Sequence, residues 1–239
     1  MSDTTAPLEA SLGHQFRNPE LLLTALTHPS YAAECDPPVP DNQRFEFLGD
    51  AILLFLTAEL VFEQHPDLQE GHLTKIRSTL TKQETLAALA RQIGLGPCLR
   101  LGKGEDRAGG RDRPSNLGDA FEAVLAALYL DGGVEPVRAL CQRLLADTLT
   151  DPEEILAREN PKGALQELTQ ELHQTTPVYE VVKVSGPEHL PEFDVRVMVG
   201  GCEIASARAG NRRTAEKIAA ELALKKLSES LPVPEPPGP

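Results

Sequence analysis

Two pairs of acidic residues attract attention because each pair falls within an otherwise apolar helical segment. In NQRFEFLGDAIL, Glu46 and Asp50 are four residues apart, and in NLGDAFEAVL, Asp119 and Glu122 are three apart. Residues at these spacings lie side by side on one face of a helix. Acidic side chains are rarely buried unless they are paired or bound to a metal. Two such helices that faced each other would place four carboxylates around a small volume.

The chemistry that four converging carboxylates could perform is metal-dependent hydrolysis of a phosphodiester bond. Mg²⁺ prefers hard oxygen ligands, and two metal ions about 4 Å apart serve phosphodiester hydrolysis in known enzymes. Gly49 lies between Glu46 and Asp50, although a glycine inside a helix costs about 1 kcal/mol relative to alanine. Close packing against another helix would explain why a glycine is present here. The alternative is that each pair is a solvated helix face, and the spacing alone does not show that the two helices meet.

The elements that must position these residues are helices. From Pro19 to Leu149 the apolar residues recur at helical spacing, and no long alternating run is present. The expected helices cover residues 46–63, 72–80, 82–93, 116–130 and 134–148. A glycine-rich basic loop is expected from Gly102 to Pro114. Residues 10–150 are therefore predicted to form one all-α domain.

A different pattern follows an acidic, proline-containing stretch at residues 151–160, which we interpret as a linker. The elements expected after it are a helix marked by Leu165, Leu168 and Leu172, strands at 178–184, 192–199 and 202–209, and a helix at 212–228. The order α-β-β-β-α predicts a small α+β domain at residues 161–229. The proline-rich tail at residues 230–239 is expected to be disordered.

Composition places few limits on the partner. The net charge of −13 would by itself argue against a polyanion, but residues 1–159 carry −11 of it and residues 160–239 only −2. No apolar run approaches the roughly 20 residues that cross a bilayer, so we expect a cytoplasmic protein without a membrane partner. The four cysteines form no CxxC pair and are interpreted as reduced; they are Cys35, Cys98, Cys141 and Cys202.

These motifs carry a resemblance to a known family. NQRFEFLGDAIL resembles the signature block of the ribonuclease III family, usually NERLEFLGDAVL, and LTHPSY at residues 26–31 resembles the segment upstream of it. Residues 99–132 resemble the second acidic block, with LGKGE, AGG, LGDAFEA and YLDGG in the family's order. The α-β-β-β-α region resembles a double-stranded-RNA-binding domain, so the resemblance covers about residues 10–228.

The resemblance implies a Mg²⁺-dependent endoribonuclease, with Mn²⁺ as an alternative ion, that cuts both strands of double-stranded RNA. It implies 5′-phosphate ends, short 3′ overhangs and a homodimer that processes ribosomal RNA precursors and other structured transcripts, including mRNA and tRNA. By matching positions, Glu46, Asp119 and Glu122 are the metal ligands, and Asp50 and Glu122 are the catalytic residues.

Two further positions would support the metal site. Gln43 stands where the family commonly has an acidic residue, so a neutral amide replaces a charge that would help to hold RNA or the second metal. Glu70 falls where the family has another supporting acidic residue. We expect the core chemistry to survive the change at position 43, with the metal dependence altered.

The second domain is expected to hold the RNA. Such domains recognise the shape of A-form RNA through minor-groove hydroxyls and the phosphates across the major groove. Matching positions imply minor-groove contacts for Gln166, Glu167 and His189. The phosphate contacts are assigned to Arg212, Arg213 and Lys217, where a helix N-terminus also offers free N–H groups. Glu216 interrupts the basic series that related domains often have there.

A second hypothesis is that the chain only binds RNA, as catalytically inactive relatives in ribosome assembly do. Such a protein would be free to lose its carboxylates. All four are present here, namely Glu46, Asp50, Asp119 and Glu122. The sequence therefore favours the enzyme.

Overall fold

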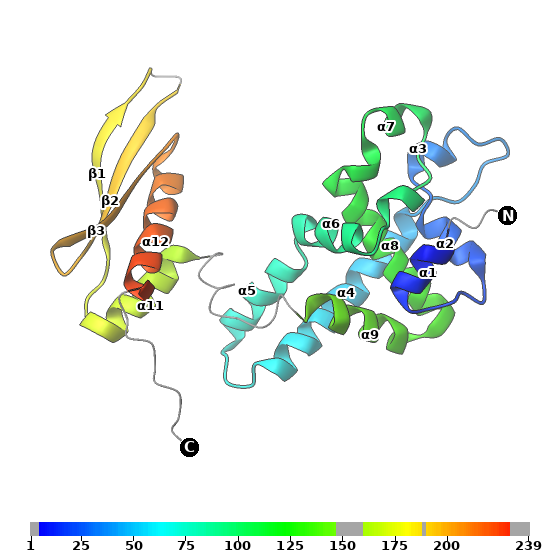
Figure 1. The fold of residues 1–239 in the computed structure, drawn as a ribbon, viewed down its shortest axis with the longest axis horizontal. Helices are drawn as coiled ribbons and strands as arrows, with labels where there is room; N and C mark the ends of the chain where they lie inside the picture. Colours follow the sequence, from blue (N-terminus) through cyan, green and yellow to red (C-terminus); the bar gives the residue numbers. More distant parts are fainter. Residues whose placement is uncertain (1–4, 147–159, 188–189, 230–239) are drawn as a thin grey trace. The chain divides into compact units, whose positions relative to one another are not determined.

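The structure is a computed structural model, and it describes residues 5–146, 160–187 and 190–229. The chain divides into two compact units, within Met1–Thr150 and Asp151–Pro239 (Figure 1). Among the residues described, none of the helices combines the length and apolar character that crossing a membrane requires. The linker expected at 151–160, apart from Asn160, and the tail expected at 230–239 lie outside the described residues.

The described residues of the first unit are mostly helical, as the sequence predicted. Its elements are α1 (Ala6–Leu12), α2 (Pro19–Ala25), α3 (Pro29–Ala32), α4 (Gln43–Gln64), α5 (Glu70–Leu80), α6 (Gln83–Gln92), η1 (Gly96–Cys98), α7 (Lys103–Arg107), η2 (Gly110–Asp112), α8 (Pro114–Gly132) and α9 (Val134–Leu145). The long helices α4 and α8 carry the two acidic pairs.

Helix α8 is the centre of this unit. It packs against α2, α4, α6 and α9 (Figure 1). Pro114 occupies its first turn, where the missing N–H costs nothing and the fixed φ suits a helix. Leu117, Phe121, Val124 and Leu128 are fully buried. A helix buried on most sides gives any acidic residue on it a poorly solvated environment.

Segments far apart in the chain meet at the start of α4. A parallel bridge joins Thr27 to Arg100, with the amide of Arg100 donating to the carbonyl of Leu26 and the amide of His28 donating to the carbonyl of Arg100. The amide of Asn42, the residue before α4, donates to the carbonyl of Thr27. The LTHPSY segment thus fixes where α4 begins relative to the loop after η1.

The structure differs from the sequence expectation in two places. The glycine-rich pattern predicts a loop at residues 102–114, but this segment contains α7 and η2, which bonds from Arg111 to the carbonyls of Pro97 and Leu99 hold in place. At the N-terminus, Leu8 of α1 is buried, so the folded unit extends before residue 10.

The second unit has the α-β-β-β-α order that the sequence predicted. Its elements are α11 (Pro161–His173), β1 (Val178–Ser185), β2 (Glu192–Val199), β3 (Cys202–Ala209) and α12 (Arg212–Glu229). The strands form one antiparallel sheet in the order β1-β2-β3 (Figure 1). Its core joins Val197 and Ala205 of the sheet to Leu165 of α11 and Ala219 of α12. The helices therefore cover one face of the sheet.

The opposite face of this sheet is polar. Successive side chains of a strand point to opposite faces, so Glu180 points away from the face that Tyr179 shares with the helices. Glu180 pairs with Arg196 of the neighbouring strand at 2.8 Å. Asp194 likewise pairs with Arg208 at 2.5 Å. The charged side chains named here are thus paired with one another within the sheet. The described residues that are expected to contact RNA lie on the two helices instead.

Candidate active site and RNA-binding surface

Helices α4 and α8 come into backbone contact at Gly49. A Cβ atom at this position would lie 1.8 Å from the carbonyl oxygen of Glu122, a distance that no side chain could occupy. The sequence prediction that Gly49 marks a close helix contact is confirmed. Glu46 and Asp50 flank Gly49 on α4, while Asp119 lies one turn before Glu122 on α8. We call these four residues the carboxylate cluster: Glu46, Asp50, Asp119 and Glu122.

The electrostatics of Glu122 show that the cluster is a unit. Burial, followed by the charges of Asp50, Glu46 and Asp119 in that order, raises the pKa of Glu122 to about 8. Like charges close together disfavour ionisation of one another. The largest shift in the cluster thus falls on the residue that the sequence assigned to both the metal site and catalysis.

The pKa values of Glu46 and Asp119 are raised as well. Burial and then the charges of Asp119 and Asp50 raise the pKa of Glu46. Burial also raises the pKa of Asp119, although the nearby His28 opposes that shift. Charges from both helices appear in the environment of Glu46. The two acidic pairs therefore meet, as the sequence suggested they could.

The cluster has the donor chemistry of a divalent-cation site. Within the described residues, none of its members forms an ion pair with a lysine or arginine. In the same part of the chain, no three Asp, Glu, His or Cys side chains converge closely enough to hold an ion. Four carboxylates whose charges repel one another suit a divalent cation, because a cation would relieve that repulsion.

His28 lies beside the cluster, which its sequence context did not reveal. Its Nδ1 accepts a hydrogen bond from the amide of Ser30 at 3.1 Å and caps the short helix α3. Ser30 Oγ in turn accepts from the amide of Gly102 at 3.0 Å. The His28 side chain opposes the rise in the pKa of Asp119 that burial causes. It also adds, after the hydrogen bond from Asn116 and the contacts of Arg113, to the lowering of the pKa of Glu105. A histidine of the LTHPSY segment therefore adjoins the acidic site.

A buried hydrogen-bond network fixes the start of α8. Asn116 Nδ2 donates to Glu105 Oε1 at 2.7 Å and to the carbonyl of Gly110 at 3.1 Å. Arg113 pairs with the same Glu105 carboxylate. Asn116 lies about one helical turn before Asp119. This network therefore fixes the part of α8 that carries the carboxylates. No local sequence pattern indicated it, since the partners come from α7 and η2.

The two supporting residues lie outside the cluster. Gln43 is the first residue of α4, and its backbone N–H donates to Asp41 Oδ1 at 3.1 Å. Glu70 is the first residue of α5, and its carboxylate accepts from Thr74 Oγ1 at 3.0 Å. Glu70 is not among the charges that shift the pKa of Glu46 or Glu122. Their supporting roles stay predictions.

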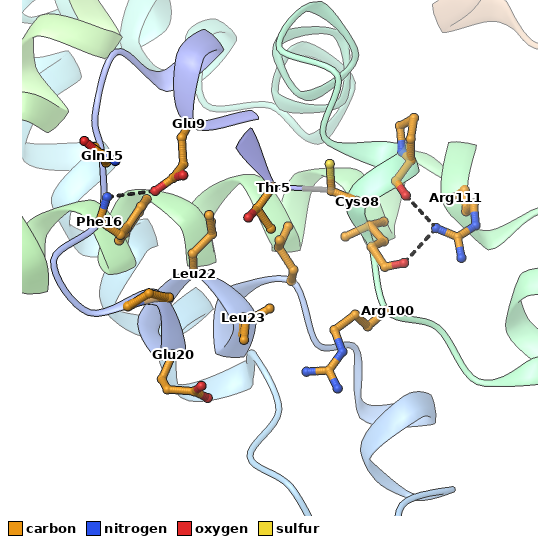
Figure 2. Close-up of a pocket in the computed structure, with 14 residues that line it drawn as sticks. Thr5, Glu9, Gln15, Phe16, Glu20, Leu22, Leu23, Cys98, Arg100 and Arg111 are labelled. Carbon is orange, nitrogen blue, oxygen red and sulfur yellow. Dashed lines mark hydrogen bonds between the residues drawn. The ribbon is translucent and has the colours of Figure 1, made fainter. Parts of the chain in front are cut away.

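A cavity of about 780 Å³ lies elsewhere in this unit. Figure 2 shows Phe16, Leu22 and Leu23 from the N-terminal segments lining it, together with Cys98 and Arg111. The hydrogen bonds of Arg111 go to backbone carbonyls and to Asp106. No member of the carboxylate cluster lines this cavity, so its size does not make it the reactive site.

The predicted RNA contacts lie on the two helices of the second unit. Gln166 and Glu167 are exposed on α11. Arg212, Arg213 and Lys217 lie in the first turns of α12, which Asn211 caps by accepting from the amide of Thr214 at 2.8 Å. His189 lies outside the described residues. The described contacts thus come from α11 and from the start of α12.

Glu216 has a role that the sequence did not predict. Its side chain is only 11% exposed. One carboxylate oxygen accepts from Arg212 Nε at 2.7 Å, and the other accepts from Lys162 Nζ at 2.6 Å. A position that looked like a missing cation is therefore a buried anion between two cations. Lys162 itself was not singled out, because its partner is 54 residues away in the chain.

Comparison with known proteins agrees with both units. Residues 18–149 match the family described as Ribonuclease-III-like, and residues 161–227 match the double-stranded RNA binding motif. The chain is 41% identical to Ribonuclease 3 of Nitratidesulfovibrio vulgaris, over 93% of this chain and 88% of that one. It is 43% identical to Ribonuclease 3 of Alkalilimnicola ehrlichii, over 93% and 95%.

A solved structure supports the fold of the first unit. The nuclease domain of the Campylobacter jejuni ribonuclease III aligns with a TM-score of 0.56 and 34% identity, covering 60% of this chain and 96% of that one. The fold and these matches define a nuclease domain joined to a double-stranded-RNA-binding domain. The chain belongs to the ribonuclease III family of endoribonucleases, and the catalytic prediction is supported over the inactive alternative.

Proposed function

We propose that this chain hydrolyses phosphodiester bonds of double-stranded RNA with Mg²⁺ held by Glu46, Asp119 and Glu122, or with Mn²⁺ in its place. The observation that carries the proposal is the crossing of α4 and α8 at Gly49, with the pKa of Glu122 raised to about 8 by burial and three neighbouring carboxylates. When bound, the ion would activate a water molecule and stabilise negative charge on the phosphate.

The residues of the chain supply the remaining parts of the mechanism. Glu122 lies at the crossing and would hold an ion together with carboxylates of both helices. Asp50 follows Gly49 on α4 and orients the attacking water. The apolar core around α8 excludes bulk solvent from one side of the cluster, which strengthens its electrostatic interactions. Gln43 and Glu70 are proposed to act at the edge of the site.

The active form is proposed to be a homodimer. Three phenylalanines of α4 are exposed, namely Phe47, Phe55 and Phe62, and Phe47 is 82% exposed. A row of exposed aromatic side chains on one helix is typical of a protein–protein contact. The related nuclease domain from Campylobacter jejuni has a region involved in dimer formation. Two copies would bring two carboxylate clusters to one duplex, so that both strands are cut.

The substrates are proposed to be ribosomal RNA precursors and other structured transcripts, in the cytoplasm. The second unit would bind any A-form duplex, because such domains recognise shape more than sequence. Gln166, Glu167 and His189 would reach minor grooves, and Arg212, Arg213 and Lys217 would contact phosphates. The four cysteines form no disulfide, which suits a reducing compartment.

Analysis of the product ends tests this function. A perfect RNA duplex with labelled strands is incubated with the full chain and Mg²⁺, and a DNA duplex of the same sequence is the control. We expect cuts in both RNA strands, 5′-phosphate ends, short 3′ overhangs and intact DNA. Unchanged RNA at every Mg²⁺ and Mn²⁺ concentration, with the duplex bound, would favour a binding protein instead.

A further inference from the structure

Glu216 connects the two helices that are assigned to RNA. Lys162 is the second residue of α11, Arg212 is the first residue of α12, and the carboxylate of Glu216 accepts a hydrogen bond from each. The ion pair between Lys162 and Glu216, with 2.6 Å between Nζ and Oε2, therefore joins the beginning of α11 to the beginning of α12. The contact between Lys217 and Glu221, by comparison, lies within α12 alone.

A strand takes part in the same arrangement. Lys162 Nζ lies 4.4 Å from the centre of the Tyr179 ring, at the start of β1. A cation over an aromatic face is attracted by the ring, more strongly where water is excluded. Lys162 is thus held from two sides, by the carboxylate on α12 and by the ring on the sheet. Its position fixes α11 against both.

The cost of this arrangement needs an explanation. A buried carboxylate is favourable only when its partners are well placed, and replacing a buried ion pair by apolar residues is often neutral for stability. A negative charge beside phosphate-binding arginines also opposes RNA electrostatically. Neither stability nor charge therefore accounts for an anion here. A requirement for a defined distance between α11 and α12 does account for it.

We propose that Glu216 is a positioning residue that sets the spacing between the minor-groove contacts of α11 and the phosphate contacts of α12. It thereby makes the second unit prefer A-form RNA over B-form DNA, whose grooves differ in width and spacing. This inference rests on the RNA-binding function proposed above. The opposite account, in which Glu216 only neutralises Arg212, predicts that removing its charge strengthens binding.

The test compares full-length variants binding RNA and DNA duplexes of one sequence and about 20 base pairs, since one such domain spans about 16. Divalent ions are left out, so that no cleavage occurs. Glu216→Gln is expected to lower RNA affinity about tenfold and to reduce the RNA-over-DNA preference, although it removes a negative charge that repels phosphate. Lys162→Met is expected to do the same, and the double variant should lose little more than either single variant.

Glu180→Gln is the matched control, because it removes an ion-paired glutamate from the polar face of the same sheet. It is expected to keep the wild-type RNA-over-DNA preference. Thermal unfolding shows which variants are folded, and Lys162→Met decides the matter if Glu216→Gln does not fold, because it leaves the pair of Glu216 and Arg212 in place. RNA binding by folded variants at or above wild-type affinity would overturn the inference. A wild-type chain that binds no RNA would instead overturn the proposed function.

Discussion

At the scale of single residues, Gly49 decides how closely the two acidic helices approach. The position it occupies would bring any Cβ to 1.8 Å from the carbonyl oxygen of Glu122, so the backbones themselves are in contact. Burial, followed by the charges of neighbouring carboxylates, then raises the pKa values of Glu46 and Glu122. A glycine at position 49 is therefore required both for the packing of the two helices and for the carboxylate cluster.

Gly49→Ala is predicted to separate α4 from α8. The overpacking should cost about 1–3 kcal/mol of unfolding free energy, more than the roughly 1 kcal/mol that alanine adds to helix stability. Cleavage should fall further than duplex binding, because the carboxylates move apart. Urea unfolding and single-turnover cleavage measure the two effects.

Gly71→Ala is the control, since a Cβ at position 71 in α5 would meet no atom within 4 Å. It should leave the stability unchanged or raise it slightly. If Gly49→Ala behaved like Gly71→Ala in both assays, close contact would not be what the site requires.

Asp131 is a second residue whose environment is unusually specific. Its carboxylate is buried and accepts from His14 Nε2 at 2.8 Å and from the amides of Arg17 and Asn18 at 3.1 and 3.0 Å. Burial by itself would raise the pKa of Asp131, but the bonds from His14, Arg17 and Asn18 lower it to about 2. This carboxylate ties the segment after α1 to the end of α8.

Asp131→Asn is predicted to lose about 2 kcal/mol of unfolding free energy at neutral pH. Because the pKa of Asp131 is lower in the folded than in the unfolded state, its contribution is fully present above about pH 4 and declines as pH falls through about 2. Chemical unfolding from pH 7 to pH 2 should show the wild-type and variant curves converging at the acid end. A constant difference across that range would show that ionisation of Asp131 is not the source.

At the scale of elements, α4 has two different faces. Leu53, Leu56 and Leu60 are buried against the rest of the first unit. On the other side, Phe47 and Phe62 are 82% and 70% exposed. A helix that is apolar on both sides needs a second partner for its outer face. The same helix thus presents the carboxylates and the proposed contact between copies.

The double variant Phe47→Ser, Phe55→Ser is predicted to convert the proposed homodimer into a monomer, because it removes two of the three exposed phenylalanines of that outer face. Sedimentation of the full chain measures the change, with Leu222→Ser, an exposed leucine of α12, as control. Cleavage of both strands should become uncoupled in the monomer. A dimer that persisted in the double variant would place the contact elsewhere.

Much of the fold follows from local sequence patterns. The periodic apolar residues of α4 and α8, and the valine-rich strands, predict elements whose bounds agree closely with the structure. The short helices α1, α2, α3 and α7 were not among the expected helices; α1 buries only Leu8 and Leu12, and α7 lies in a glycine-rich segment. Their formation depends on bonds to distant residues that periodicity does not report.

The candidate site was predictable to the extent that its signals are local. The spacing of the acidic pairs and the cost of Gly49 within a helix both indicated the α4–α8 contact. The positions of His28 and Glu216 were not predictable, because their neighbours lie far away in the sequence. Glu216 shows the difficulty well, since its charge alone suggested a weaker RNA contact.

At the scale of the whole molecule, the negative charge is concentrated in the catalytic part of the chain. Residues 1–159 carry −11 and residues 160–239 carry −2 of the total of −13. Each unit also has a buried core of its own. Catalysis and RNA binding are therefore assigned to separate units. The second unit should matter most under conditions that weaken RNA binding.

A chain shortened to end at Thr150 is predicted to stay folded and dimeric and to cut duplex RNA at low salt only. Phosphate contacts release counterions, so a protein with fewer of them keeps less affinity as salt rises. Cleavage rates from low to physiological salt, compared with the full chain, measure this. Inactivity of the folded short chain at every salt concentration would show that the chemistry also needs the second unit.

The central claim is that the carboxylate cluster performs the cleavage, and Glu122→Gln tests it most directly, because it keeps the side-chain shape and removes one charge. Cleavage of an RNA duplex in Mg²⁺ and duplex affinity without divalent ions are measured on the same preparation, with the exposed Glu84→Gln of α6 as control. We predict cleavage at least about 100-fold slower for Glu122→Gln, unchanged duplex affinity, and wild-type behaviour for the control. Cleavage by Glu122→Gln at the wild-type rate would contradict the account.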